Sequence, residues 1–472
     1  MAVQKIAGET TADRFLKVLC RLVLKVFFRR VEVVGLEDLP PDRPLVLVAN
    51  HVNGMVDPLL LYGPLPVVPR FLAKSTLWDV PVLKNLLDLA GVIPVYRRRD
   101  PGVDPSQNVE TFARCHELLA QGGTIALFPE GTSHSEPGLL PLKTGAARIA
   151  LEAEAKHGPL GVRIVPVGLI YDEKQRFRSR VLVEVGEPLD PSPELADFAP
   201  VSGEGDEDEI PEASRRAVQR LTDRIDQALA AVTLNYESWD EARRIGRAAD
   251  LYGRPRLDVP RRRRLQEEYG LRRGFLEAYA EMRERRPEEV HELAEAVARY
   301  DRMLEAFGLR DDQVAARYAP APVVRFLTRS LVSLGLGFPV AVIGTVLNWL
   351  PYRIVAWLAY RQREFPDQQA TYKIFPGLLL YPAFWGTEAI LAGWAAVRWL
   401  DWSSWAVGLG VFATGPVTGW VALRFQETWR RLWREARAFL VLRTRRQTAE
   451  ELRERREEVY RRIEELAREW EG

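Results

Sequence analysis

Cysteine, histidine and net charge are all scarce in this chain of 472 residues. The only cysteines, Cys20 and Cys115, offer no disulfide framework, which fits a reducing compartment. Neither a CxxC pair nor paired histidines occur at metal-ligand spacing, so we expect no metal site. The 66 basic and 65 acidic residues nearly cancel, and no basic run is interleaved with aromatic residues, so we expect no nucleic-acid partner. A signal-peptide layout is also missing, because Lys17, Arg21 and Lys25 interrupt the first apolar stretch.

Uncharged apolar runs of membrane-spanning length are absent from the first two thirds of the chain. They occur later, at 331–350 and 403–423, which carry no charge, and at 374–397, which carries only Glu388. Each is long enough to cross a bilayer, which needs about 20 apolar residues.

These runs predict a membrane region over 321–425. Arginines lie on both sides of the first run, so we expect both of its flanks on the cytoplasmic face, and Pro339 could bend it. We predict a re-entrant or broken helix at 331–350 and a hairpin of 374–397 and 403–423, with three full crossings as the alternative. The composition is rich in Leu, Arg and Ala and poor in Lys, which indicates a GC-rich bacterial genome, so we expect the membrane to be a bacterial inner membrane.

The remaining segments predict an α/β domain with helical additions. Residues 59–190 alternate strand and helix patterns, as in α/β domains. Residues 13–30 predict an amphipathic helix on an anionic membrane surface, whose basic face contains Lys17, Arg21, Lys25 and Arg29; a helix packed on the core is the alternative. The acidic run 203–209 predicts a solvated linker. The expected order is a membrane-surface helix (1–30), an α/β domain (31–190), an acidic linker with a helical domain (191–320), the membrane region (321–425) and a charged helix (426–472).

The candidate active centre lies at the end of a predicted strand. The apolar run 44–49 reads as a buried strand, and Asn50 and His51 follow at its C-terminal end, where α/β folds place their chemistry. Asp57 comes six residues after His51, beyond a turn containing Gly54 that can fold it back toward the imidazole. A histidine that removes a hydroxyl proton gains from a carboxylate that orients its ring. The alternative is a loop histidine that caps a helix start.

Three further stretches align with this centre: Gly91–Arg97, Phe128–Gly145 and Ile164–Tyr171. Together the four stretches resemble the ordered blocks of the glycerolipid acyltransferase superfamily, whose mark is NHX4D followed by FPEG. FPEGTSHSEPGLLPLKTGAARIAL and GLIYDEKQRFRSRVLVEVGEPL are similar to the fungal-type glycerol-3-phosphate/dihydroxyacetone-phosphate acyltransferases. Those enzymes also carry a C-terminal membrane region after a helical insert.

The resemblance implies an α/β acyltransferase domain, with a mixed sheet flanked by helices, and a direct transfer mechanism. His51 would be the general base on the acceptor hydroxyl, and Asp57 would hold and stabilise it. The acceptor oxygen would attack the thioester of acyl-CoA, and no Ser or Cys stands in a nucleophile-elbow setting. No cofactor is implied beyond acyl-CoA as co-substrate. The implied substrate-binding residues are Asn50, Arg97, Glu130, Gly131, Thr132, Ser133 and Lys143.

Within this set, a phosphate needs fixed cations and backbone donors. We assign it to Arg97, the 131–133 turn and Lys143, while Glu130 would order the loop, pair with a basic residue or contact a glycerol hydroxyl. The alternatives are a solvated run for Arg97 with Arg98 and Arg99, surface positions for Lys143 and His134, and a structural role for Tyr171.

The leading interpretation is acylation of glycerol 3-phosphate, or of dihydroxyacetone phosphate, at the sn-1 hydroxyl to give lysophosphatidic acid. The expected partners are acyl-CoA, glycerol 3-phosphate and a lipid bilayer. The rival enzyme acylates 1-acyl-glycerol 3-phosphate with the same residues; its branch more often has Arg where Ser133 follows FPEGT. A non-catalytic membrane scaffold is a further alternative, and a transporter would leave the four blocks unexplained.

Overall fold

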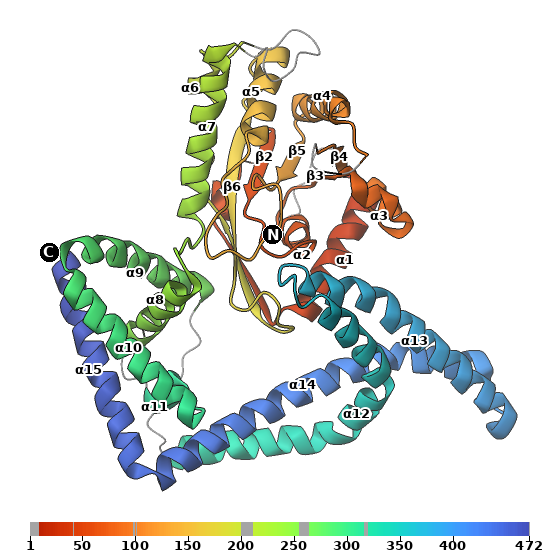
Figure 1. Ribbon diagram of the computed structural model, residues 1–472. Helices are drawn as coiled ribbons and strands as arrows, with labels where there is room; N and C mark the ends of the chain where they lie inside the picture. The colour runs from red at the N-terminus through yellow and green to blue at the C-terminus, as the bar shows by residue number, and fades with distance from the viewer. Residues whose placement is uncertain are drawn as a thin grey trace. The chain divides into compact units, whose positions relative to one another are not determined.

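The computed structural model describes residues 9–40, 42–97, 100, 102–199, 211–253, 264–315 and 320–471. The acidic run 203–209 and Arg98 and Arg99 lie outside the described residues. The chain forms two compact units, one of residues 1–237 with 363–371 and one of residues 238–362 with 372–472. The short segment 363–371 thus belongs to the first unit, although the chain on both sides of it belongs to the second (Figure 1).

The first unit is built on a seven-stranded sheet of order β1-β7-β6-β2-β5-β3-β4. All neighbouring strands are parallel except β6 and β7, which are antiparallel. The predicted α/β domain with a mixed sheet is therefore confirmed. The strands are β1 (Arg30–Val34), β2 (Leu45–Ala49), β3 (Pro69–Lys74), β4 (Ile93–Val95), β5 (Thr124–Leu127), β6 (Arg163–Tyr171) and β7 (Arg180–Val185).

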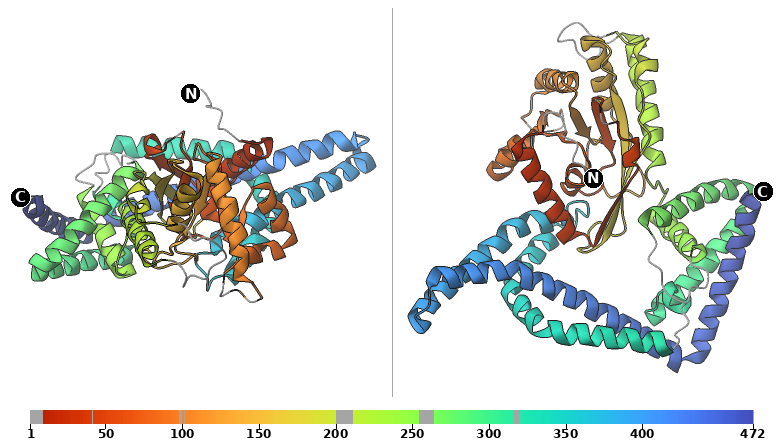
Figure 2. Two further views of the ribbon diagram at one scale, coloured as in Figure 1. Left: turned by 90° about the horizontal axis from the view of Figure 1, so that it is seen from above. Right: turned by 180° about the vertical axis from the view of Figure 1, so that it is seen from behind.

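Helices pack on this sheet around an apolar core. Val46 and Val48, on one face of β2, pack with apolar residues of α4, α5 and α7. Figures 1 and 2 show α5 and α7 side by side over the sheet. β2 is fully buried along its length, as its apolar sequence predicts. The helices are α1 (Thr11–Phe27), α2 (Val56–Tyr62), α3 (Pro81–Leu89), α4 (Asn108–Ala120), α5 (Gly145–His157), α6 (Ser192–Leu195) and α7 (Glu212–Ala231).

Helix α1 exposes an apolar face where the sequence predicted a basic one. Lys17 is buried and donates to the Leu65 carbonyl, and Arg21 donates to the Gly63 carbonyl, so these two cations of the expected basic face bind the domain. The exposed stripe is apolar and consists of Phe15, Val18, Leu22 and Val26. The sequence contains two apolar stripes at helical spacing, and packing of Leu16, Cys20, Leu24 and Phe27 in the core leaves the other outside.

The second unit is helical. Its helices are α8 (Trp239–Tyr252), α9 (Leu265–Arg285), α10 (Pro287–Phe307), α11 (Asp311–Ala315), α12 (Pro320–Arg361), α13 (Gln369–Leu400), α14 (Ser404–Thr444) and α15 (Arg446–Glu471). The residues of α13 up to Thr371 belong to the first unit, and the rest of the helix belongs to the second. Apolar residues of α8, α10, α14 and α15 share one core. Three of its helices are long and apolar enough to cross a membrane: Arg325–Arg361, Gln369–Leu400 and Ser404–Thr444.

Segment 331–350 is not broken in the structure. It lies inside α12, which is continuous and contains Pro339 and Pro351. The ribbon of α12 changes direction along its length in Figure 1, as interior prolines lead one to expect, and part of it runs beside α14 in Figures 1 and 2. The number of crossings and the sidedness stay predictions.

The expected domain boundaries also differ from the compact units. Helix α7 packs on the α/β core through Val218, Leu221 and Ile225, so the first unit extends past residue 190 to residue 237. The charged C-terminal segment is not one helix, because α14 continues to Thr444 and α15 follows it.

Candidate active site

The site forms where two neighbouring parallel strands end. Val48 of β2 pairs with Leu127 of β5, so the residues that follow each strand meet at one edge of the sheet. β2 leads into Asn50 and His51, and β5 leads into the FPEG turn that starts at Phe128.

His51 and Asp57 form the dyad that the sequence predicts. Nδ1 of His51 lies 2.9 Å from Oδ2 of Asp57. Asp57 is fully buried in the first turn of α2. Its Oδ2 also accepts a 2.7 Å hydrogen bond from the backbone N–H of Asn53. The two residues are separated by five residues, one more than the HX4D mark counts, and the turn between them contains Gly54 at φ +46°. The resemblance therefore holds in geometry although the spacing differs.

The ring of His51 is held with its second nitrogen available. It stacks on Phe128 with ring centroids 4.1 Å apart and an angle of 14°. Among the described residues, Nε2 makes no hydrogen bond, and the side chain is 19% exposed. With Nδ1 bound by a carboxylate and Nε2 open, the imidazole is set up to accept a proton from a bound hydroxyl.

Tyr171 completes this arrangement from the end of β6. Its hydroxyl donates to Oδ1 of Asp57, the oxygen that His51 does not use. Burial, and then the negative charge of Asp57, raise the pKa of Tyr171 well above its ordinary value, so the hydroxyl keeps its proton. We interpreted this tyrosine as structural from sequence; the contact with Asp57 makes it part of the site.

Both carboxylate oxygens of Glu130 bind residues of the loops that follow β2 and β5. One carboxylate oxygen accepts the backbone N–H of His51 at 2.6 Å, and the other accepts Nε2–H of His134 and the Leu140 amide. Nδ1 of His134 accepts the Glu136 amide, which places the ring proton on Nε2. His134 is buried, so the surface alternative for it is wrong. Of the roles considered for Glu130, loop ordering through a basic partner fits these contacts.

The two cations assigned to phosphate lie on either side of Gly131. Nη1 of Arg97 donates to the Gly131 carbonyl at 3.3 Å, while its other nitrogens bind both oxygens of Asp100. A Cβ at Gly131, which has φ +71°, would lie 2.9 Å from Nζ of Lys143. Lys143 is exposed, and its ammonium makes no ion pair with any described residue, whereas Arg97 is neutralised by Asp100. Of the two cations beside this turn, Lys143 is therefore the one whose charge no described residue neutralises.

Asn50 and Ser133 have partners within the protein. Both atoms of the Asn50 amide bind the Leu169 backbone, at 3.1 and 2.7 Å, so this side chain joins the end of β2 to β6 rather than facing a substrate. The Ser133 hydroxyl donates to Oδ2 of Asp367 at 2.6 Å. The Thr132 hydroxyl makes only a 3.4 Å contact with the Ser133 carbonyl.

Sequence reasoning missed Lys174 and Asp367. Lys174 is an internal tie: its ammonium donates to the carbonyls of Val52 and His134 and to Oγ of Ser135. Because β6 is a neighbour of β2, its C-terminal end lies at the same sheet edge, and that was the available signal for Tyr171 and Lys174. Asp367 is 234 residues from Ser133, and no local pattern marks it.

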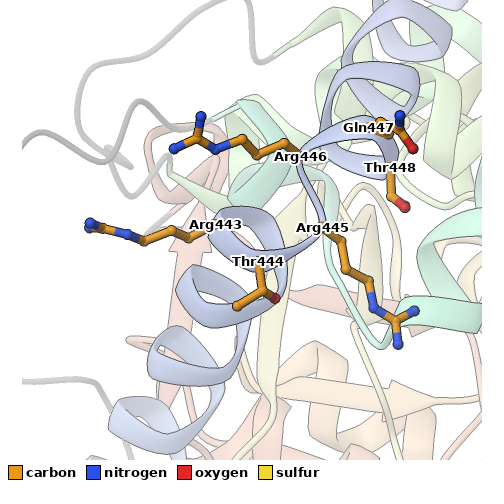
Figure 3. A pocket seen from close by; sticks show the side chains of 6 residues that line it. All are labelled: Arg443, Thr444, Arg445, Arg446, Gln447 and Thr448. Carbon is orange, nitrogen blue, oxygen red and sulfur yellow. The ribbon is translucent and has the colours of Figure 1, made fainter.

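A hollow of about 400 Å³ in the second unit does not offer comparable chemistry. It lies at the junction of α14 and α15 and is lined by Arg443, Thr444, Arg445, Arg446, Gln447 and Thr448. Figure 3 shows that Arg443 and Arg446 extend to one side and Arg445 to the other. The lining contains neither a histidine nor a carboxylate, so it supplies no general base.

Comparison with known proteins matches both parts of the chain. The family model described as Acyltransferase matches residues 30–170, and the one described as Glycerol-3-phosphate acyltransferase 2 C-terminal domain matches residues 247–471. Glycerol-3-phosphate O-acyltransferase 2 of Saccharomyces cerevisiae is 30% identical over 301 residues, covering 60% of this chain and 38% of the yeast protein. Glycerol-3-phosphate O-acyltransferase 1 of the same yeast is 38% identical over 129 residues, 27% of this chain and 16% of that protein.

A third relative is named for a different activity. The chloroplastic 1-acyl-sn-glycerol-3-phosphate acyltransferase BAT2 of Brassica napus is 33% identical over 145 residues, 30% of this chain and 38% of that protein. The chain thus spans less than half the length of each of these relatives. The two family matches confirm the resemblance carried by the four motifs: the chain has an acyltransferase domain, and the part that follows it matches the C-terminal domain of glycerol-3-phosphate acyltransferase 2.

Proposed function

We propose that this protein transfers a fatty acyl group from acyl-CoA to the sn-1 hydroxyl of glycerol 3-phosphate, or to the hydroxyl of dihydroxyacetone phosphate. The product from glycerol 3-phosphate is lysophosphatidic acid. One observation carries the proposal: the open Nε2 of His51, whose other nitrogen is bound by Asp57, belongs to the same loop cluster as a turn flanked by Arg97 and Lys143.

The chemistry follows from these positions. Nε2 of His51 removes the proton as the acceptor oxygen attacks the thioester carbonyl. A C–O bond forms, the C–S bond breaks, and the proton passes from the imidazolium to the leaving thiolate, so that free CoA is released. Asp57 stabilises the imidazolium in between. Lys143 and Arg97 hold the phosphate, with Arg97 exchanging its Asp100 partner for the substrate.

A second acceptor is supported by the Brassica napus relative, whose name gives 1-acyl-sn-glycerol 3-phosphate as its acceptor. Acylation at sn-2 would use the same base and the same cations. We favour the first acceptor because the yeast glycerol-3-phosphate enzyme aligns over 60% of the chain, against 30% for the plant enzyme.

We further propose that the protein is integral to a membrane, with its acyltransferase unit on the cytoplasmic face. Three apolar helices support membrane association. The exposed stripe of α1 (Phe15, Val18, Leu22 and Val26) is flanked by Arg14 and Lys25, as in helices that lie in an anionic lipid interface. This location would let the lipidic product enter the bilayer without crossing water.

The test is an assay of the purified full chain with palmitoyl-CoA, in which glycerol 3-phosphate and lysophosphatidate are offered in parallel. Product from glycerol 3-phosphate supports the proposed acceptor. Product from lysophosphatidate alone moves the enzyme to the second acceptor with the same catalytic residues. Absence of product from both would favour a non-catalytic scaffold.

A further inference from the structure

The segment 363–371, which joins α12 to the start of α13, packs on the candidate active site. Oγ1 of Thr371 accepts a 3.1 Å hydrogen bond from the Met55 amide, in the turn between His51 and Asp57. A Cβ at Gly54 would lie 2.9 Å from that oxygen and 3.1 Å from the Asp367 carbonyl. The turn therefore fits this segment closely, and the segment belongs to the same compact unit as the turn.

Asp367 projects a carboxylate from this segment. The residue is 7% exposed, and Oδ2 accepts the hydroxyl hydrogen of Ser133 at 2.6 Å. Its other oxygen, Oδ1, accepts no hydrogen bond from the described residues. The nearby ammonium of Lys174 is already bound to three other oxygens. A largely buried carboxylate with an unused oxygen calls for a donor, and the described residues supply none there.

Ser133 connects this carboxylate to both halves of the site. Its neighbour His134 donates its backbone N–H to the His51 carbonyl at 3.1 Å, next to the general base. On the other side in sequence lies Gly131, with Lys143 and Arg97 beside it. Asp367 is therefore bound to a loop residue that lies in sequence between the contact with the His51 backbone and the turn assigned to the phosphate.

We infer that Asp367 accepts a hydrogen bond from the second hydroxyl of glycerol 3-phosphate and so sets the acceptor specificity. In that substrate the hydroxyl is on the middle carbon, between the reacting oxygen and the phosphate. Dihydroxyacetone phosphate has a carbonyl there, which cannot donate and would meet the carboxylate as a second acceptor. A site built around such a donor rejects the analogue that lacks it. The inference depends on the proposed function.

The experiment measures kcat/KM for glycerol 3-phosphate and for dihydroxyacetone phosphate with the full chain, and compares their ratio. We expect Asp367→Ala to lower kcat/KM for glycerol 3-phosphate by about 10- to 100-fold, the range of a hydrogen bond to a charged group, without a loss for dihydroxyacetone phosphate, because its carbonyl no longer meets a carboxylate. Asp367→Asn keeps an oxygen for Ser133 and turns an N–H toward the middle carbon. It should therefore move the ratio furthest toward dihydroxyacetone phosphate.

Thr371→Val is the matched control, because it loosens the same segment and leaves the carboxylate in place. It should lower both values by the same factor. The ratio does not depend on the fraction of folded enzyme, so a destabilised variant remains informative. Equal losses for both acceptors in the Asp367 variants would overturn the inference alone. A wild-type enzyme inactive on both acceptors would overturn the proposed function and the inference together.

Discussion

The hydroxyl of Tyr171 donates a hydrogen bond to Oδ1 of Asp57, on the opposite side of the carboxylate from His51. The Asn53 amide supplies a third donor to the same buried group. Tyr171 and Asn53 therefore fix the carboxylate of Asp57 in the orientation in which Oδ2 faces Nδ1 of His51. This arrangement keeps a firm acceptor for the imidazolium that forms when His51 takes up a proton.

Replacing Tyr171 by Phe tests this relationship. The carboxylate of Asp57 would lose the donor that fixes Oδ1, so it would hold the His51 ring less firmly in the orientation that proton transfer needs. We expect kcat to fall about tenfold, the effect of one hydrogen bond to a charged group.

Tyr62→Phe is the matched control for that variant. Tyr62 is also buried, and it donates to the Asp13 carboxylate at 2.8 Å, within the cluster that ties α1 to Arg70. It should lower the melting temperature and leave kcat unchanged. A Tyr171→Phe enzyme that melts earlier but keeps the wild-type kcat would reduce Tyr171 to a packing residue.

Lys143 should contribute to binding of the acceptor and not of the donor. Its ammonium has no partner among the described residues, whereas the guanidinium of Arg97 is paired with Asp100. We expect Lys143→Ala to raise KM for glycerol 3-phosphate by about tenfold and leave KM for acyl-CoA unchanged. Lys84→Ala, which removes an exposed lysine paired with Asp88, serves as the control. Equal KM values for wild type and Lys143→Ala would show that the phosphate binds elsewhere.

His116 should make the acyltransferase unit lose stability in mild acid. Burial, with the nearby cations of Lys156, His157 and Arg148, lowers the pKa of His116 to about 4. The Glu152 carboxylate, 3.4 Å from its Nε2, opposes this shift weakly because Arg148 and Lys156 already neutralise it. The unfolded chain binds the proton from about pH 6.5 downward and the folded chain only near pH 4.

Stability is therefore complete above about pH 6.5, and about 3 kcal/mol is lost as the pH falls to about 4. The measurement is the melting temperature of wild type and His116→Gln across this range. The variant cannot take up the proton, so its melting temperature should fall less steeply. Parallel curves for the two proteins would remove His116 from the acid response.

The part of the site that sequence predicts is the part encoded locally. The apolar run of β2 predicts a buried strand, and the turn after it brings Asp57 back to His51. The role of Glu130 was harder to predict from the sequence. Its partners depend on how the loop after β2 packs against the loop after β5. The exposed face of helix α1 was wrongly predicted, because periodicity shows two apolar stripes and cannot say which one packs in the core. Its position on a membrane surface stays a prediction.

Asp367 lies beyond sequence reasoning altogether. It reaches Ser133 across 234 residues, from a connecting segment between two apolar helices. Only tertiary structure shows that residues 363–371 belong with the α/β unit. The same holds for α7, whose apolar face completes the core of a domain although the last strand ends earlier, at Val185.

The role of His51 as general base is tested by the initial rate of glycerol 3-phosphate-dependent CoA release from acyl-CoA, measured for the wild type and for His51→Ala. Both proteins are compared in lipid nanodiscs at equal acyl-CoA occupancy. We expect a rate lower by about 10²- to 10⁴-fold in the variant, with unchanged acyl-CoA binding and membrane insertion, because only the general base is lost. A variant that keeps a rate within about threefold of wild type would contradict the assignment of His51 as the base.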